Sequence, residues 1–113
     1  MSPLVRVHAP LGPDLIDYLT RIARYNRRTQ AATNWRFDVH AGPDFLDWIR
    51  HDAPGAIAIF SSRNRGKIER ITAALEAGLH VVADKPAIIE PAELSRLDAA
   101  ICLAQERRLV LVT

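Results

Sequence analysis

The sequence has one cysteine, Cys102, and no long hydrophobic run. One cysteine cannot form an internal disulfide bond, which is typical of proteins in a reducing cytoplasm. No apolar stretch reaches the roughly 18 residues that a membrane-spanning helix needs. The N-terminus has no basic region followed by a long apolar segment, as a signal peptide would. We therefore predict a soluble cytoplasmic protein without a membrane segment.

Several motifs that carry chemistry are absent as well. There is no Gly-Lys-Ser/Thr phosphate loop and no Gly-x-Ser-x-Gly elbow, so nothing supports an NTPase or a hydrolase. The four histidines form no pair at metal-ligand spacing, and we predict no metal site. Structural roles are expected for His8, His40 and His80, which fall at the edges of predicted strands. Cys102 lies between two apolar residues of a predicted helix, where burial is expected.

The composition is that of one globular domain. The 113 residues leave room for a single domain, and 49% hydrophobic with 25% charged residues argues against disorder. The net charge is only +2, although a cluster of arginines lies at Arg21, Arg24, Arg27 and Arg28. That cluster could be a nucleic-acid surface, but no nucleic-acid motif accompanies it. We predict a solvated helix face with an adjoining loop and no nucleic-acid partner.

Short apolar runs alternate with segments of helical periodicity along the whole chain. Alternation of this kind predicts an α/β fold with a mostly parallel sheet of about five strands and four helices. The predicted strands are 4–7, 36–40, 56–60, 81–83 and 109–112. The predicted helices begin at Pro13, Pro43, Lys67 and Pro91. The first helix is expected to end near Asn26, and Gly78 is expected to stop the third.

The apolar residues predict which faces are buried. The run at 56–60, Ala-Ile-Ala-Ile-Phe, is apolar throughout, as in a strand covered on both faces of a parallel sheet. Helical spacing predicts three inward stripes. They comprise Leu15, Ile16, Leu19, Ile22 and Ala23 in the first helix, Ile68, Ile71, Ala74 and Leu75 in the third, and Leu94, Leu97, Ile101 and Ala104 in the fourth. The helix from Pro43 would bury Phe45, Leu46 and Ile49.

Two stretches of the first half resemble each other. Val-His-Ala at 7–9 precedes Gly-Pro-Asp at 12–14, and Val-His-Ala at 39–41 leads directly into Gly-Pro-Asp at 42–44. Two strand-to-helix turns that use the same favourable residues explain this likeness without an ancestral repeat. Either origin predicts two successive strand–helix units.

The stretch 56–86 carries a more specific pattern. Ser-Arg-Asn at 62–64 follows a strand, Ala-Leu-Glu-Ala-Gly at 74–78 ends a helix, and Asp-Lys-Pro at 84–86 follows the next strand. In this order and spacing, the segment resembles the Gfo/Idh/MocA oxidoreductases. The likeness continues through the helix and strand at 91–112. The start, Ala-Pro-x-Gly-Pro-Asp at 9–14, also resembles a subgroup of that family classified only as oxidoreductases.

The resemblance implies a partial Rossmann-like, nucleotide-binding domain spanning residues 1–113. Ligands of open α/β sheets bind outside the carboxyl ends of the strands, where both loops of the pattern would lie. By resemblance, the cofactor is NAD or NADP, and the complete protein exchanges hydride with a sugar or polyol. The implied cofactor-binding residues are Ser61, Ser62, Asn64, Asp84, Lys85 and Pro86. Lys85 would also be catalytic, because a lysine there can hold a substrate hydroxyl or help to move its proton.

The family's first strand and Gly-x-Gly-x-x-Gly turn have no counterpart in the sequence, and neither does its substrate domain. The strand at 4–7 would therefore be the family's second strand, without its usual neighbour. We interpret the chain as a fragment whose isolated form is inactive and binds the cofactor weakly or not at all. The alternative is a non-catalytic degenerate Rossmann module that completes its sheet with a partner chain, for which a homo-oligomer is one form.

Overall fold

The computed structural model describes residues 4–44, 47, 49–51, 56–61 and 63–113. Within these residues the chain forms five strands, three α-helices and one short 3-10 helix. Strands and helices alternate, and each strand pair is parallel. The predicted α/β fold with about five parallel strands is therefore confirmed, although the described strands form two small sheets and not the single sheet expected. The chain divides into two compact units, residues 1–48 and 49–113, and each unit has its own small sheet.

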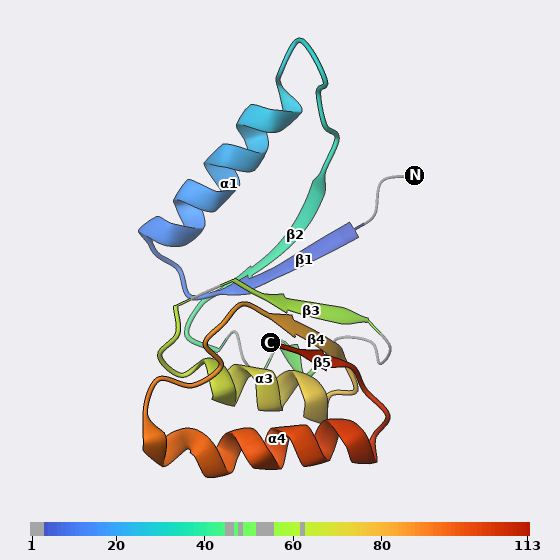
Figure 1. Ribbon diagram of the computed structural model, residues 1–113. Coiled ribbons are helices and arrows are strands. Elements are labelled where there is room, and N and C mark those ends of the chain that lie inside the picture. The colour runs from blue at the N-terminus through green and yellow to red at the C-terminus, as the bar shows by residue number, and fades with distance from the viewer. Residues whose placement is uncertain (1–3, 45–46, 48, 52–55, 62) are drawn as a thin grey trace. The chain divides into compact units, whose positions relative to one another are not determined.

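The N-terminal unit is a strand–helix–strand segment. Strands β1 (Leu4–Ala9) and β2 (Arg36–Ala41) pair in parallel over their whole length, and α1 (Pro13–Asn26) connects them (Figure 1). Pro13 occupies the first helical turn, where its missing N–H costs no hydrogen bond. The bounds of α1 agree with the prediction, and both strands extend slightly beyond theirs.

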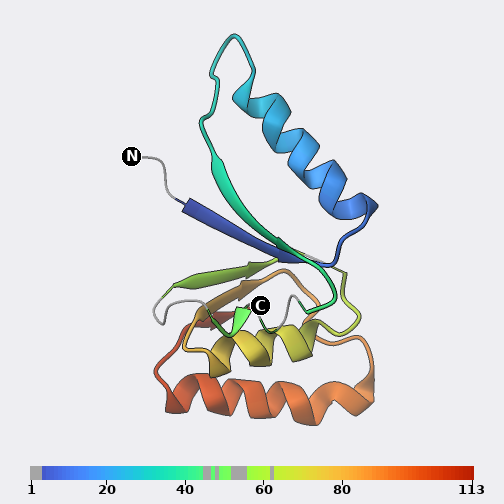
Figure 2. The ribbon, with the colours of Figure 1, turned by 180° about the vertical axis from the view of Figure 1, so that it is seen from behind.

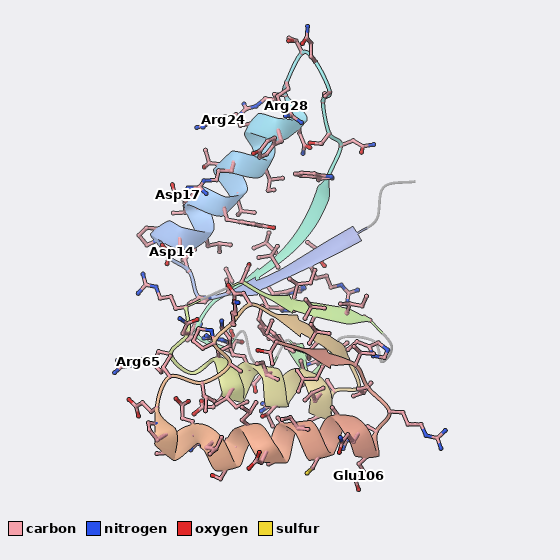
Figure 3. All side chains as sticks on the ribbon, in the orientation of Figure 1. Asp14, Asp17, Arg24, Arg28, Arg65 and Glu106 are labelled. Atoms are coloured by element: carbon pink, nitrogen blue, oxygen red, sulfur yellow. The ribbon has the colours of Figure 1, made fainter. Side chains whose placement is uncertain are left out.

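Helix α1 buries less of its apolar stripe than predicted. Leu15 is buried, whereas Leu19, Ile22 and Ala23 are half-buried and Ile16 is 59% exposed. The backbone of α1 approaches β1 and β2 closely at few points, so most of the stripe is left only partly covered within the described residues. The charges of α1 follow its dipole, with Asp14 and Asp17 toward the N-terminal end and Arg24 in the last turn, and Arg28 lies just beyond the helix (Figure 3).

The connection from α1 to β2 is held by the side chain of Asn26. Its Oδ1 accepts hydrogen bonds from Thr33 Oγ1 at 2.6 Å and from the Trp35 backbone N–H at 3.0 Å. Its Nδ2 donates to the Trp35 carbonyl at 2.9 Å. The rings of Tyr25 and Trp35 also lie 5.8 Å apart, and the Arg28 guanidinium lies 4.7 Å from the Tyr25 ring. Part of the predicted arginine cluster thus has a structural role in this loop.

The C-terminal unit contains a three-stranded parallel sheet in the order β3-β4-β5. Its strands are β3 (Ile57–Phe60), β4 (His80–Ala83) and β5 (Leu111–Val112). Helix α3 (Lys67–Glu76) connects β3 to β4, and the 3-10 helix η1 (Pro91–Glu93) with α4 (Leu94–Glu106) connects β4 to β5. Both α-helices lie on the same side of the sheet (Figure 2).

Helices α3 and α4 end in the same hydrogen-bond pattern. After α3, the Gly78 N–H donates to the Leu75 carbonyl and the Leu79 N–H to the Ala74 carbonyl, each at 3.0 Å. This arrangement is a Schellman motif, which needs a left-handed residue, and Gly78 has φ 87°. The predicted stop at Gly78 is confirmed. Arg108 takes the corresponding position after α4, with φ 55°.

The core of this unit is formed mainly by α3 and β4. The side chains of Ile68, Ile71, Leu75 and Val81 are completely buried, which confirms the predicted inward face of α3. The prediction for α4 is wrong in part. Ala100 and Ala104 are its buried residues. Leu94 is 54% exposed and Ile101 is 40% exposed, and Cys102 is exposed as well. Small alanines allow α4 to approach α3 closely, and the larger residues are then turned outward.

The opposite face of this sheet is apolar and open. Ile57 is 65% and Ile59 73% exposed on β3, and Val82 and Val112 on the neighbouring strands are 41% and 52% exposed. The prediction that β3 is covered on both faces is therefore wrong for this unit taken by itself. Its described helices cover one face only, so the residues that alternate toward the other face remain in contact with solvent.

The predicted helix from Pro43 is described only in part, at residues 43–44, 47 and 49–51. Phe45 and Leu46 lie outside the described residues, whereas Ile49 is described and is buried. Among the helices that the structure describes, none combines the length and the apolar character needed to cross a bilayer.

Candidate functional site

The loops after β3 and β4 lie at the same edge of the C-terminal sheet. The two strands are parallel and in register, with Phe60 opposite Ala83. Directly beyond this pair, the Asp84 N–H donates to the Phe60 carbonyl at 3.1 Å. The predicted residues Ser61 and Asn64 follow β3, and Asp84, Lys85 and Pro86 follow β4. The prediction that both loops share one rim is confirmed, while Ser62 lies outside the described residues.

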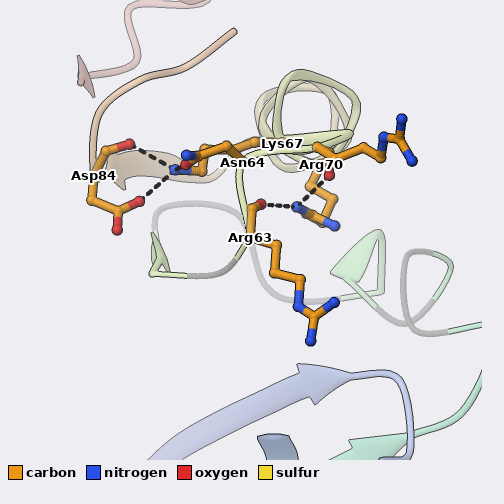
Figure 4. A network of polar contacts seen from close by, with 6 residues as sticks. Arg63, Asn64, Lys67, Arg70 and Asp84 are labelled. Carbon is orange, nitrogen blue, oxygen red and sulfur yellow. Dashed lines mark hydrogen bonds and ion pairs between the residues drawn. The ribbon is translucent and has the colours of Figure 1, made fainter. Parts of the chain in front are cut away.

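A buried lysine joins the two loops. Lys67 is the first residue of α3, and its side chain has no exposed surface. Its ammonium donates hydrogen bonds to Asn64 Oδ1 at 2.9 Å, to the Asp84 carbonyl at 2.9 Å and to Asp84 Oδ1 at 2.5 Å (Figure 4). The first acceptor lies in the loop after β3 and the other two in the loop after β4. Lys67 is thus the physical link between the two predicted binding segments.

Arg70, one turn further along α3, holds the backbone of the first loop. Its Nη2 donates to the carbonyls of Arg63 and Arg65, at 2.7 and 3.1 Å. Burial lowers the pKa of the Arg70 guanidinium from its ordinary value, and the Glu69 carboxylate partly opposes this effect. Two cationic side chains of α3 therefore fix the loop that follows β3.

Lys85 stands in contrast to Lys67. It is exposed, and none of the described residues forms a hydrogen bond or an ion pair with its ammonium. The Lys85–Pro86 peptide bond is cis, and Ala87 immediately after it is buried. The turn thus presents a lysine to solvent between two anchored residues, Asp84 and Ala87.

Sequence reasoning missed Lys67 and Arg70. Lysines are almost never fully buried, so a lysine in the first helical turn is ordinarily assigned to the surface. One signal was available, because a cation at the N-terminal end of a helix is disfavoured by the helix dipole. A lysine at such a position needs a nearby anion, which here is Asp84.

A second polar cluster lies on the paired strands of the N-terminal unit. Arg6 and Asp38 are cross-strand partners, and so are His8 and His40. Asp38 Oδ2 lies 3.8 Å from Arg6 Nε and 3.4 Å from His40 Nε2. The two imidazoles stack with their centroids 5.1 Å apart. Within the part of the chain that the structure describes, no three potential metal ligands come together.

His80 and a hollow in the C-terminal unit involve none of the predicted site residues. His80 Nδ1 accepts a hydrogen bond from the Val110 N–H at 3.0 Å, so the side chain has a structural role between β4 and β5. A hollow of about 570 Å³ is lined by Arg65, Gly66, Glu69, Ile89, Glu90, Ala92, Glu93 and Arg96. Its charges are of both signs, and Arg96 pairs with Glu69 at 2.9 Å.

Comparison with known proteins identifies the fold. No protein-family model and no curated protein matches the sequence. A solved structure from Parabacteroides merdae, of a protein assigned as an oxidoreductase, is 32% identical with a TM-score of 0.89. It matches 96% of this chain, which covers 25% of that protein.

Two characterised enzymes share the fold at lower identity. Biliverdin reductase from Synechocystis, solved with biliverdin and NADP⁺, is 18% identical with a TM-score of 0.57. The match covers 96% of this chain and 36% of the biliverdin reductase chain. Homoserine dehydrogenase from Staphylococcus aureus is 16% identical with a TM-score of 0.55. The match covers 99% of this chain and 33% of the dehydrogenase chain. The chain thus spans between a quarter and about a third of these proteins. The partial Rossmann-like fold and the resemblance to oxidoreductases of the Gfo/Idh/MocA type are confirmed.

Proposed function

We propose that residues 1–113 are part of the cofactor-binding region of a cytoplasmic NAD(P)-dependent oxidoreductase. In the complete protein, hydride would pass between the nicotinamide and a sugar or polyol. The observation that carries this proposal is the rim at which Lys67 joins Asn64 to Asp84. Ligands of Rossmann-type sheets bind beyond the carboxyl ends of the strands, and these loops occupy that position.

The exposed groups of the rim suit a ligand rich in hydroxyl and amide groups. Asn64 Oδ1 is bonded to Lys67, which leaves the N–H donors of the same amide for a ligand. The Asp84 side chain is 56% exposed and can accept hydrogen bonds from hydroxyl groups. Ser61 is also exposed and can donate or accept. Donors and acceptors of this kind fit the ribose and carboxamide of a nicotinamide nucleotide, whose role when bound is to give or take hydride.

Lys85 is the residue that we assign to the substrate. An exposed ammonium can donate a hydrogen bond to a substrate hydroxyl, and it can take part in moving the proton of that hydroxyl. Pro86 limits the backbone conformations of the turn that presents the lysine. The roles of Ser62 and Pro86 at the cofactor follow from the resemblance alone and belong to the proposal.

We predict that the isolated chain binds NAD(H) weakly or not at all. The Gly-x-Gly-x-x-Gly turn, through which the backbone approaches the pyrophosphate, does not occur in these 113 residues. Isothermal titration calorimetry with NADH and NADPH is expected to give no binding at micromolar concentrations. A submicromolar dissociation constant would show that this sequence holds the cofactor without that turn.

One observation favours the alternative of a module that completes its sheet with a partner chain. β3 pairs with β4 along one edge, and its Ile57 and Ile59 are largely exposed. If a second copy pairs with the open edge of β3 and also covers this face, light scattering after size exclusion is expected to give an oligomeric mass. Ile59→Lys would then return the chain to a monomer. Ile89→Lys, at an exposed position just before η1, would leave the oligomer intact. A monomer at all concentrations argues against the alternative.

A further inference from the structure

The side chain of Lys67 is in an environment that charged groups rarely occupy. It is completely buried, and it begins a helix, where the dipole disfavours a cation. An ammonium has three donors, and all three here have an acceptor: Asn64 Oδ1, the Asp84 carbonyl and Asp84 Oδ1. The buried charge is thus fully compensated, and two of its three partners belong to one residue, Asp84.

Asp84 is fixed at three of its atoms as a result. Its N–H is bonded to the Phe60 carbonyl, and its carbonyl and carboxylate are both bonded to Lys67. The Asp84 carbonyl belongs to the planar peptide group that leads to the nitrogen of Lys85, so the start of Lys85 is fixed as well. The carboxylate of Asp84 is engaged by Lys67, while no described residue pairs with the neighbouring Lys85 ammonium.

We propose that Lys67 is a positioning residue that retains the Asp84 carboxylate and so leaves the Lys85 ammonium free for a ligand. The inference deepens the proposed function and rests on it in one respect, the assignment of Lys85 to the substrate. Without Lys67, the half-exposed carboxylate of Asp84 pairs with the adjacent Lys85 and competes with the ligand for its hydrogen bonds. Lys67 therefore acts through Asp84 and contacts no ligand itself.

Acylation of individual lysines tests this inference directly. The folded chain is treated with a limiting amount of an N-hydroxysuccinimide ester of acetate, and the rate at each lysine is read by mass spectrometry. In the unmodified sequence, Lys67 is expected to react at least about tenfold more slowly than Lys85, since a buried, bonded amine reacts only after local opening. Equal rates at the two lysines would overturn the proposal without any variant.

The Lys67→Met variant separates this role from general loosening of the loop. Pairing with the released carboxylate is expected to slow acylation of Lys85 by about two- to fivefold, the range typical of one exposed ion pair. A loop that merely becomes more mobile would leave Lys85 as reactive or more so, and that result would overturn the proposal. Adding Asp84→Asn to Lys67→Met removes the released carboxylate and is expected to restore the original rate. A double variant that stays slow would equally refute the role of Asp84.

The matched control is Glu69→Gln, which breaks an exposed ion pair with Arg96 on neighbouring helices of the same unit. It is expected to leave both lysine rates unchanged, and a slowing of Lys85 as large as in Lys67→Met would overturn the specificity claimed for Lys67. Circular dichroism confirms that each variant is folded. These rates need no cofactor, so their outcome is independent of the calorimetry that tests the proposed function.

Discussion

Replacement of Asp84 by alanine is expected to lower the free energy of unfolding of the C-terminal unit by about 2–3 kcal/mol. The variant leaves the Lys67 ammonium buried without its anion, and removing one partner of a buried ion pair costs about 3–5 kcal/mol. We place the loss at or below the lower end of that range because Lys67 retains two neutral acceptors and the Asp84 side chain is itself 56% exposed. Hydrogen exchange of the Ile71 and Val81 amides, followed in urea, measures this loss in the C-terminal unit alone.

The control for this prediction is Glu69→Ala. Glu69 pairs with Arg96, and both side chains are 60% exposed, so the loss is expected to stay below about 1 kcal/mol. Fluorescence is unsuited to the comparison because both tryptophans, Trp35 and Trp48, precede the C-terminal unit. If Asp84→Ala and Glu69→Ala had equal small effects, Lys67 would have reached solvent at little cost, and the ion pair would not stabilise the rim.

The second large effect is expected from Ile71→Ala. The side chain of Ile71 in α3 is completely buried, and truncation of a buried isoleucine to alanine costs about 2–5 kcal/mol through lost burial and the cavity that remains. We expect a loss near the middle of that range, about 3 kcal/mol, because the site is enclosed by rigid secondary structure. Chemical denaturation with hydrogen exchange as the readout measures it.

Ile59→Ala is the matched control, since it removes the same atoms from the open face. Ile59 is 73% exposed, so its truncation is expected to cost less than about 1 kcal/mol. The contrast between the two isoleucines tests whether the sheet is packed on one face only. Equal losses would mean that Ile59 is covered in solution, which is the result that a partner chain on this face would give.

The sequence was sufficient to predict the element order and the shared rim. Helix starts at Pro13 and Lys67, and the stop at Gly78, were predicted correctly because each depends on local backbone chemistry. The juxtaposition of Asn64 with Asp84 was predictable because parallel neighbouring strands end at one edge. These inferences need only local pattern and the rules of parallel sheets.

Burial was harder to predict than secondary structure. Ile57 and Ile59 have the sequence of a covered strand, yet periodicity cannot reveal whether a second layer exists within the same unit. Ile101 was predicted to face inward, but α4 instead packs through Ala100 and Ala104, a choice that depends on the distance to α3. The hydrophobic pattern of the sequence shows which residues can be buried. Which of them are buried depends on the elements that pack against them.

The role of Lys67 was beyond the reach of pattern for a different reason. Its burial depends on acceptors in two loops that lie 3 and 17 positions away in sequence. No periodicity relates a lysine to an aspartate at that separation. The parallel pairing of β3 and β4 brings Lys67 and Asp84 together. The role of Lys67 can therefore be recognised only from the tertiary contacts.

The pairing of β1 with β2 has a consequence for how copies of this chain behave when concentrated. Val-His-Ala at 7–9 lies opposite Val-His-Ala at 39–41, so the two strands are identical at three of their six paired positions. At these three positions, either strand would meet the same side chains if it paired with its own counterpart in another molecule. Pairing of β1 with the β1 of another molecule would keep a histidine opposite a histidine, but it would place Arg6 opposite Arg6 and no longer opposite Asp38. The charges of Arg6 and Asp38 thus oppose intermolecular pairing of like strands, although residues 7–9 alone would permit it.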